Sequence, residues 1–236
     1  MKLSDFLDAL SYGELSQYAS GTEDSGRIWY KDLPKFITFI NAGLLRLYTD
    51  LPISQKQVTV QTNVNQTKYL LSSEFALSKE PEGGDEVNRY ILDLEDEFED
   101  DIITIEQVVN ENEFIFPLNS PDEEFAVFTP GPNRLLIPEP RNELVAVLYR
   151  ARHKKIPVTR RLDADEYEIN VPDYCEDALI NYCAYRFVKS GGSAESVNLS
   201  NAYLAAYENE VFRIKEAGII TENIYTNTRI WRDSWV

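Results

Sequence analysis

Apolar residues recur at helical spacing near the start of the chain. In residues 2–19 they fall mostly on one helical face, and a longer stripe follows Asp32, with Pro34 close behind it. Proline loses no needed N–H in a first helical turn, so the pattern predicts a second helix that Asp32 caps and Pro52 ends. The stripe of this helix consists of Leu33, Phe36, Ile37, Ile40, Leu44 and Leu47.

The same spacing returns in the last third. Val171-Pro172-Asp173 is a helix start, and this helix should end at Gly191-Gly192, because glycine suits the left-handed conformation that terminates helices. Residues 195–217 predict a last helix that Gly218 stops. We expect the stripe of the second helix to pack on Leu179, Tyr182, Cys183 and Phe187, because amphipathic helices bury their apolar faces against one another.

Between the helix pairs, short alternating segments are separated by Pro, Gly and Asn. Residues 57–61 and 67–71 predict a hairpin, and further strands are expected at 102–109, 113–118, 125–129, 134–137 and 143–150. Turns recurring at intervals of about 8–12 residues favour a small antiparallel sheet or sandwich. The predicted class is α+β: residues 1–54 and 172–217 form one antiparallel helix bundle, 55–171 an inserted antiparallel β region, and 218–236 an extended C-terminal tail.

Composition argues against most catalytic classes. The 236 residues include 40 acids, 23 bases and a single His, with a net charge of −17. This charge disfavours general adhesion to nucleic-acid phosphates or anionic lipid. We find no Gly-rich phosphate loop, nucleophile elbow or paired Cys or His motif, so we expect no enzyme, no cofactor and no metal. Cys175 and Cys183 would lie about 12 Å apart on a helix, too far for a disulfide. With no targeting or membrane-spanning segment in view, we expect a soluble protein made in a reducing cytosol.

Two charged runs are candidate sites. Residues 93–101 hold seven carboxylates, but Phe98 and Thr104 occupy the positions where a calcium loop needs Gly and Glu, so we interpret the run as a solvated loop. Residues 150–161 hold six of the 23 bases, and extended chain puts Arg150, Arg152 and Lys154 on one face. We interpret them as a candidate inter-subunit basic face or a structural salt-bridged one, with a nucleic-acid patch as the alternative. His153, inside this run, is interpreted as structural.

Several phrases, in this order, resemble the head-to-tail adaptor proteins (connector, or tail-tubular A-like) of short-tailed bacteriophages. They are residues 29–33 and 40–44, 105–110 and 117–119, 145–153, and 171–174 continuing to 178–182. The resemblance implies a virion protein at the head–tail interface, made in the host cytoplasm. It implies a ring of copies, commonly twelve-fold, that binds the portal protein and the tail (nozzle) protein. DNA would pass through the ring without sequence-specific binding, and no membrane is involved. The family pattern lacks an acidic insertion like that around residues 82–101.

The C-terminal tail is aromatic but shows no helical period. Trp, Tyr and Arg are the residue types most enriched in interface hot spots, so we expect this segment to bind the portal or a neighbouring subunit. The predicted contact residues are Ile224, Tyr225, Ile230, Trp231, Arg232 and Trp235. The alternatives are a tail that folds back on its own subunit and, for the whole chain, a soluble acidic binding module such as a DNA-mimic inhibitor.

Overall fold

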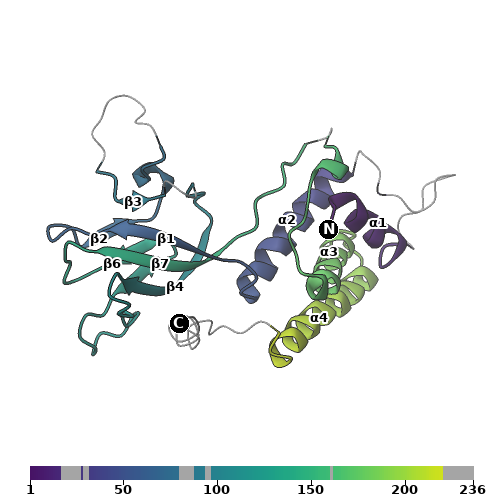
Figure 1. Cartoon of the computed structure of the whole chain (residues 1–236). Coiled ribbons are helices and arrows are strands. Elements are labelled where there is room, and N and C mark those ends of the chain that lie inside the picture. Colours follow the sequence, from purple (N-terminus) through teal and green to yellow (C-terminus); the bar gives the residue numbers. More distant parts are fainter. Residues whose placement is uncertain (17–27, 29–31, 80–87, 94–96, 160–161, 220–236) are drawn as a thin grey trace, which may run out of the picture. The chain divides into compact units, whose positions relative to one another are not determined.

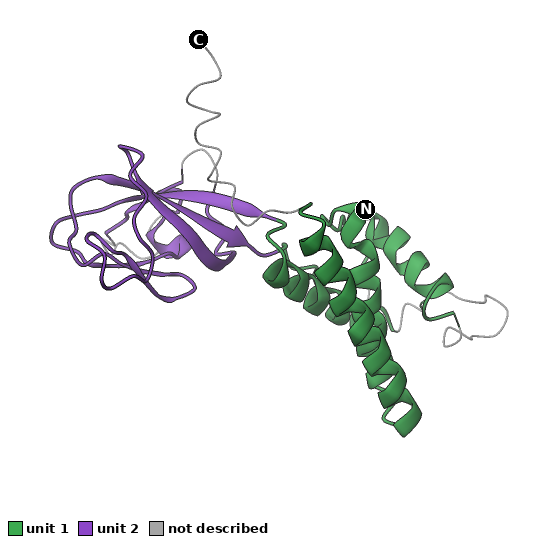
Figure 2. Ribbon diagram, turned by 90° about the horizontal axis from the view of Figure 1, so that it is seen from below, with its two compact units in different colours: residues 1–53, 153–236 green, residues 54–152 purple. Residues whose placement is uncertain are grey.

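The computed structural model describes residues 1–16, 28, 32–79, 88–93, 97–159 and 162–219 (Figure 1). It divides the chain into two compact units, coloured separately in Figure 2. Unit 1 comprises residues 1–53 and 153–236, and unit 2 comprises residues 54–152. The protein is therefore a mixed α+β chain, with helices in unit 1 and antiparallel sheets in unit 2.

Unit 1 is built from helices of both chain ends. They are α1 (Leu3–Tyr12), α2 (Leu33–Asp50), α3 (Glu176–Lys189) and α4 (Ala194–Glu216), with short 3-10 turns at Ala164–Glu166 and Asp173–Cys175. The predictions for α2, α3 and α4 are confirmed to within a few residues. Gly192 and Gly218, which follow α3 and α4, have positive φ values of 74° and 60°, as the terminating role requires. Among the described helices, none is both long and apolar enough to cross a bilayer.

Two details of the helix starts and ends differ from the predictions. Helix α1 ends at Tyr12 rather than near residue 19, because Gly13 leaves helical geometry and its N–H closes the last turn on the carbonyl of Ala9. Asp32 does precede α2, with Pro34 in the first turn, but its side chain makes no capping hydrogen bond. Its backbone carbonyl instead accepts the N–H groups of Lys35 and Phe36.

The apolar stripe of α2 is buried along its whole length, and α2 contacts α3, which in turn contacts α4. Phe36 stacks on Phe187 with ring centroids 5.3 Å apart. Gly43 lies so close to α3 that an added Cβ would stand 2.7 Å from Cδ1 of Leu179. The contact of Phe36 with Phe187 is one of those expected between the α2 stripe and α3, and Gly43, which is not part of the stripe, brings α2 close to Leu179.

Unit 2 contains two antiparallel sheets (Figure 1). The four-stranded sheet has the order β3 (Ile91–Leu92), β1 (Gln55–Gln61), β7 (Leu144–Ala151), β4 (Ile102–Asn110). The three-stranded sheet has the order β2 (Lys68–Leu70), β6 (Arg134–Leu136), β5 (Phe128–Gly131), and a 3-10 turn lies at Ser73–Phe75. Side chains of both sheets, including Val58, Val147, Tyr69 and Leu135, belong to one hydrophobic cluster, so the small antiparallel β region predicted from the sequence is present.

The predicted hairpin between residues 57–61 and 67–71 is wrong. Strand β1 pairs with β3 and β7, whereas β2 pairs with β6, so the two segments enter different sheets. Polar groups of the connection between them have other partners. Thr62 donates its hydroxyl to the carbonyls of Arg141 and Glu143, and the hydroxyl of Tyr69 bonds to the backbone of Asn63 and Gln66.

The segment 113–118 is not a strand either. It makes only single bridges, from Ile115 to Val109 and from Leu118 to Val127. Pro117 has no N–H to donate, and Glu113 and Asn119 have positive φ values of 62° and 56°, which interrupt an extended run.

The structure also assigns residues 153–171 to unit 1, whereas the sequence interpretation had placed them in the β region. Several described residues of this stretch form hydrogen bonds with the N-terminal segment and α2. The amide of Asn41 in α2 bonds to both backbone groups of Ile156 (2.8 and 2.9 Å). Leu3 donates its N–H to the carbonyl of Tyr167, and Ile169 donates to that of Met1.

Candidate functional site

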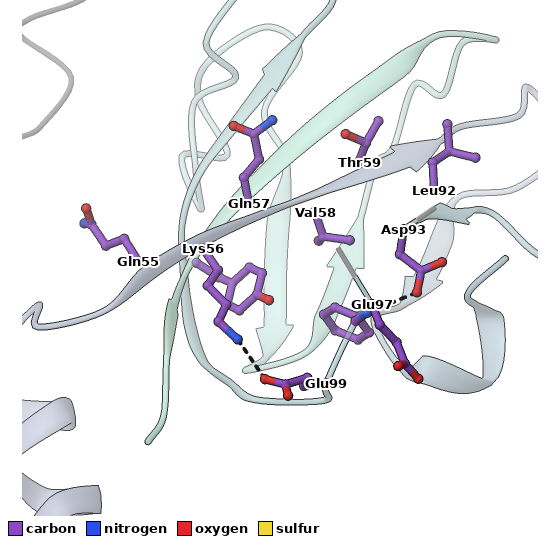
Figure 3. Close-up of a pocket in the computed structure, with 11 residues that line it drawn as sticks. Gln55, Lys56, Gln57, Val58, Thr59, Leu92, Asp93, Glu97 and Glu99 are labelled. Carbon is purple, nitrogen blue, oxygen red and sulfur yellow. Dashed lines mark hydrogen bonds and ion pairs between the residues drawn. The ribbon is translucent and has the colours of Figure 1, made fainter. Parts of the chain in front are cut away.

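Residues 55–59 of strand β1 border a cavity of about 1030 Å³ in unit 2. Lys56 and Val58 point from one face of the strand toward the acidic segment, while Gln57 and Thr59 point from the other face, as strand alternation requires (Figure 3). The remaining walls come from Leu92 and Asp93, from residues 97–99 and from Tyr149.

Lys56 is the charged centre of this site. Its ammonium lies 2.9 Å from Oε2 of Glu99 and 2.7 Å from Oδ2 of Asp101, whose side chain is only 8 % exposed. Burial alone would lower the pKa of Lys56, but the hydrogen bonds and charges of Asp101 and Glu99 raise it above its ordinary value. Burial, reinforced by the Asp101 carboxylate, likewise raises the pKa of Tyr149. Lys56 therefore stays protonated and fastens the acidic segment to β1, rather than acting as a nucleophilic amine.

Asp93 holds the other end of the same segment. Its carboxylate accepts the N–H of Ser78 at 2.9 Å and that of Phe98 at 3.0 Å, together with the Ser78 hydroxyl. Burial would raise the pKa of Asp93, but these hydrogen bonds lower it below the ordinary value, so the group stays ionised.

The prediction that residues 93–101 form a solvated loop is therefore wrong for three of them. Asp93, Phe98 and Asp101 are buried. The ring of Phe98 packs edge-on to Tyr149 and so holds the segment against the sheet. There Lys56 pairs with Asp101, and backbone N–H groups bond to Asp93. Oδ1 of Asp101 has no hydrogen-bond partner among the described residues. The described residues contain no group of three or more His, Cys, Asp or Glu arranged to hold a metal.

The structure divides the predicted basic face between the two units. Arg150 belongs to unit 2, where its Nη2 and Nε bond to Oε1 of Glu106 at 2.7 and 2.9 Å in a largely buried pair, and Gln55 donates to the other oxygen of Glu106. Arg152 donates from Nη2 to the carbonyl of Asp100 at 2.9 Å. Lys154 belongs to unit 1 and is exposed. Arg150 thus has a structural role within its own sheet.

His153 is fixed in one neutral form. Its Nε2 accepts the N–H of Asn170 at 3.1 Å, so the ring proton must reside on Nδ1, which faces the carbonyl of Lys154 at 2.5 Å. The ring packs edge-on to Tyr48, whose hydroxyl donates to the carbonyl of Asn170. Burial lowers the pKa of His153. These contacts agree with the structural role predicted for it.

Both thiols of unit 1 are free and buried. Burial raises the pKa of Cys175 to about 12, and it raises the pKa of Cys183 as well, so neither is a thiolate near neutral pH. They fill core space, as predicted. The predicted tail contacts at Ile224, Tyr225, Ile230, Trp231, Arg232 and Trp235 lie outside the described residues.

The sequence interpretation missed an exposed group on the connection between β4 and β5. Phe114, Ile115 and Phe125 all present much of their side chains to solvent. The signal was available, because these apolar residues stand in a stretch, residues 111–125, that contains five acids and no Lys or Arg. Assigning 113–118 to a strand concealed it, since a strand would have directed Phe114 and Phe116 to the same buried face.

Comparison with known proteins found no protein-family model that matches the chain and no matching curated protein.

Proposed function

We propose that the chain is a structural virion protein, a head-to-tail adaptor whose copies form a ring between the portal and the tail of a short-tailed bacteriophage. The observation that carries the proposal is the order of its elements. Helices α1 and α2 precede an antiparallel β unit, and α3 and α4 follow it. Short sequence segments that resemble the adaptor family occur in both helical parts and in the β unit. In this role the ring binds the portal on one side and the nozzle protein on the other, and DNA passes through its channel.

The arrangement within unit 1 supports an architecture that such a role needs. We propose that the helices of the two chain ends form an antiparallel bundle, held by the stacking of Phe36 on Phe187 and by the close approach at Gly43. When both ends of the chain belong to the helical bundle, the β unit is an insertion, and neither chain terminus lies in it. Two separate units also offer the two different contact faces that a ring subunit must present to its neighbours.

The tail is the part we assign to portal binding. Its predicted contact residues, which include Trp231 and Trp235, would bury large aromatic surface on docking, and this burial would offset the entropy of ordering the segment. Deletion of residues 219–236 tests the assignment. We expect a folded protein with near-native melting that no longer co-sediments with portal rings, while the full chain does.

Two results would contradict this assignment. One is a truncated protein that does not fold, which would mean that the tail packs on its own subunit. The other is a truncated protein that still binds the portal with full affinity. The matched variant keeps the full tail but replaces Trp231 and Trp235 by Ala. It distinguishes the contribution of the two aromatic side chains to portal binding from that of the rest of the tail.

The net charge of −17 favours a second candidate, an acidic module that mimics DNA and blocks a nucleic-acid-binding enzyme. The two candidates differ in what they bind. A mimic would act as a small monomer or dimer that competes with DNA for a basic protein surface, and it would ignore portal rings. Co-sedimentation with a portal, alongside a DNA-competition assay on a DNA-binding enzyme, separates them.

A further inference from the structure

Unit 2 presents an aromatic patch on the connection between β4 and β5. Phe114, Ile115 and Phe125 are 43 %, 47 % and 39 % exposed, and exposed apolar side chains that lie together mark interaction sites, whereas scattered single ones do not. The ring of Phe114 lies edge-on to that of Phe125, with centroids 6.2 Å apart, and the guanidinium of Arg141 lies 4.9 Å over the Phe125 ring. We call these four residues the aromatic patch.

The backbone beneath the patch is held in place. Oδ1 of Asn110 accepts the N–H groups of Asn112 and Phe114, at 3.0 and 2.9 Å. Phe116 is buried in the core of unit 2, with its ring 5.2 Å from that of Phe114. Phe125 has a φ of 61°, a left-handed conformation that a bulky side chain rarely adopts. Conformations of this kind persist where the surrounding structure enforces them, and they cluster at binding sites. Rigid anchors also lose little freedom when a partner binds.

Charge defines the chemistry of the partner. Residues 111–125 carry five acids, all of them exposed, and no Lys or Arg, so the segment that bears the three apolar side chains forms an acidic border, whereas Arg141 supplies a cation over the Phe125 ring. Such a border repels nucleic-acid phosphate and anionic lipid alike. The matching surface is a protein surface with an exposed apolar side chain among lysines or arginines.

The chain itself contains a segment of that kind. Residues 150–161 include six bases and no acid. In the described part of this segment that belongs to unit 1, Lys154 and Lys155 are exposed and Val158 is 46 % exposed. We propose that the aromatic patch of one copy binds residues 154–159 of a second copy, with Val158 against the aromatic rings and the two lysines facing the acidic border.

A contact between two different faces repeats head to tail, so it produces open chains or closed rings. The inference deepens the proposed function and rests on it for the closure of the copies into a ring. The pairing of the two faces can be measured without a portal.

Zero-length carbodiimide crosslinking of the full chain tests the pairing, because it joins carboxylates to lysine amines only when they touch. In a mixture of isotope-labelled and unlabelled protein, we expect crosslinks between copies that join Glu123 or Glu124 to Lys154 or Lys155. Phe125→Asn should reduce them about tenfold or more, as loss of a central aromatic anchor does. Asn tolerates a positive φ better than Phe, so this variant removes the ring without weakening the fold. Phe212→Ala, which truncates a Phe that is 61 % exposed on α4, is the matched control and should leave the crosslinks unchanged.

Mixing variants tests the head-to-tail arrangement. Lys154→Glu/Lys155→Glu disrupts one face and Phe125→Asn disrupts the other, so each variant alone should crosslink about tenfold less than the wild type or weaker still. Their mixture retains one intact pair of faces and should give dimers without the higher species of the wild type. The proposal is overturned if the wild type gives no such crosslinks, if Phe125→Asn crosslinks as the wild type does, or if the mixture gives no dimers. A chain that pairs in this way but ignores portal rings would overturn the proposed function and leave the pairing intact.

Discussion

Truncation of Phe36 to Ala is the most direct test of how the two ends of the chain are joined. Phe36 is 4 % exposed, stacks on Phe187 of α3 and lies edge-on to Phe39, with ring centroids 6.2 Å apart. Phe→Ala substitutions in cores cost about 3–5 kcal/mol, because apolar area is lost and the cavity refills only in part. The stack couples α2 to α3, so we place Phe36 within this range rather than below it.

The loss is measurable as a shift in thermal melting. For a chain of this size, 1 kcal/mol corresponds to roughly 2–4 °C, so Phe36→Ala should lower the midpoint by about 6–20 °C. Phe212→Ala makes the same chemical change at a side chain that is 61 % exposed, and should stay within about 0.5 kcal/mol of the wild type. Hydrogen exchange on the same samples locates the effect, which should appear as lost protection in α2 and α3.

Two results would refute the reasoning. An unchanged midpoint for Phe36→Ala would mean that the α2 stripe does not carry the stability of unit 1. Equal losses for Phe36→Ala and Phe212→Ala would mean that the exposure of the two rings does not set their contribution.

Three further predictions follow from the charged groups. Lys56→Met should lower the free energy of unfolding by about 1–3 kcal/mol, because it leaves Asp101 buried without its cation. Lys68→Met, at an exposed lysine, should change it little, and Lys56→Met/Asp101→Asn should recover part of the loss. Urea unfolding measures all three variants. Burial lowers the pKa of His153 in the folded state, so its contribution to stability is fully present above the unfolded value of 6.5 and is lost as the pH falls from there through the lower folded pKa. His153→Gln should remove this pH dependence, which urea titrations at neutral and mildly acidic pH measure. The −17 charge multiplies around a ring and opposes closure, so free protein should sediment as a weakly associating monomer, and a stable ring at low salt without a portal would contradict this.

The helices were predictable because their signals are local. The stripe from Leu33 to Leu47, the proline after Asp32 and the glycines after α3 each act within a few residues, and the observed helices follow them. The predicted end of α1, near residue 19, was wrong because the apolar pattern continues beyond Gly13, whereas the helix ends at this glycine.

Strand pairing was not predictable in the same way. Gln55 pairs with Arg150, about a hundred positions later in the chain, and the sequence around Gln55 contains no signal for that pairing. Alternation correctly identified segments that become β1 and β2, but the nearest alternating segment was the wrong partner for β1. The same limitation affected the basic run, because the acid that engages Arg150 is Glu106 on β4.

The distribution of the acids bears on the two candidate functions. A DNA mimic needs carboxylates that are available to a basic surface, yet each described acid of the densest acidic run, residues 93–101, already has a partner within unit 2. Lys56 holds Glu99 and Asp101, Lys79 pairs with Glu97, and Asp93 is buried under hydrogen bonds from Ser78 and Phe98. Residues 111–125 carry five further acids in the same stretch as the exposed Phe114, Ile115 and Phe125 of the aromatic patch. Acids grouped around aromatic anchors suit a specific protein contact, because apolar anchors supply affinity while charge selects the partner. This arrangement favours a subunit that binds other proteins over one that imitates a phosphate backbone.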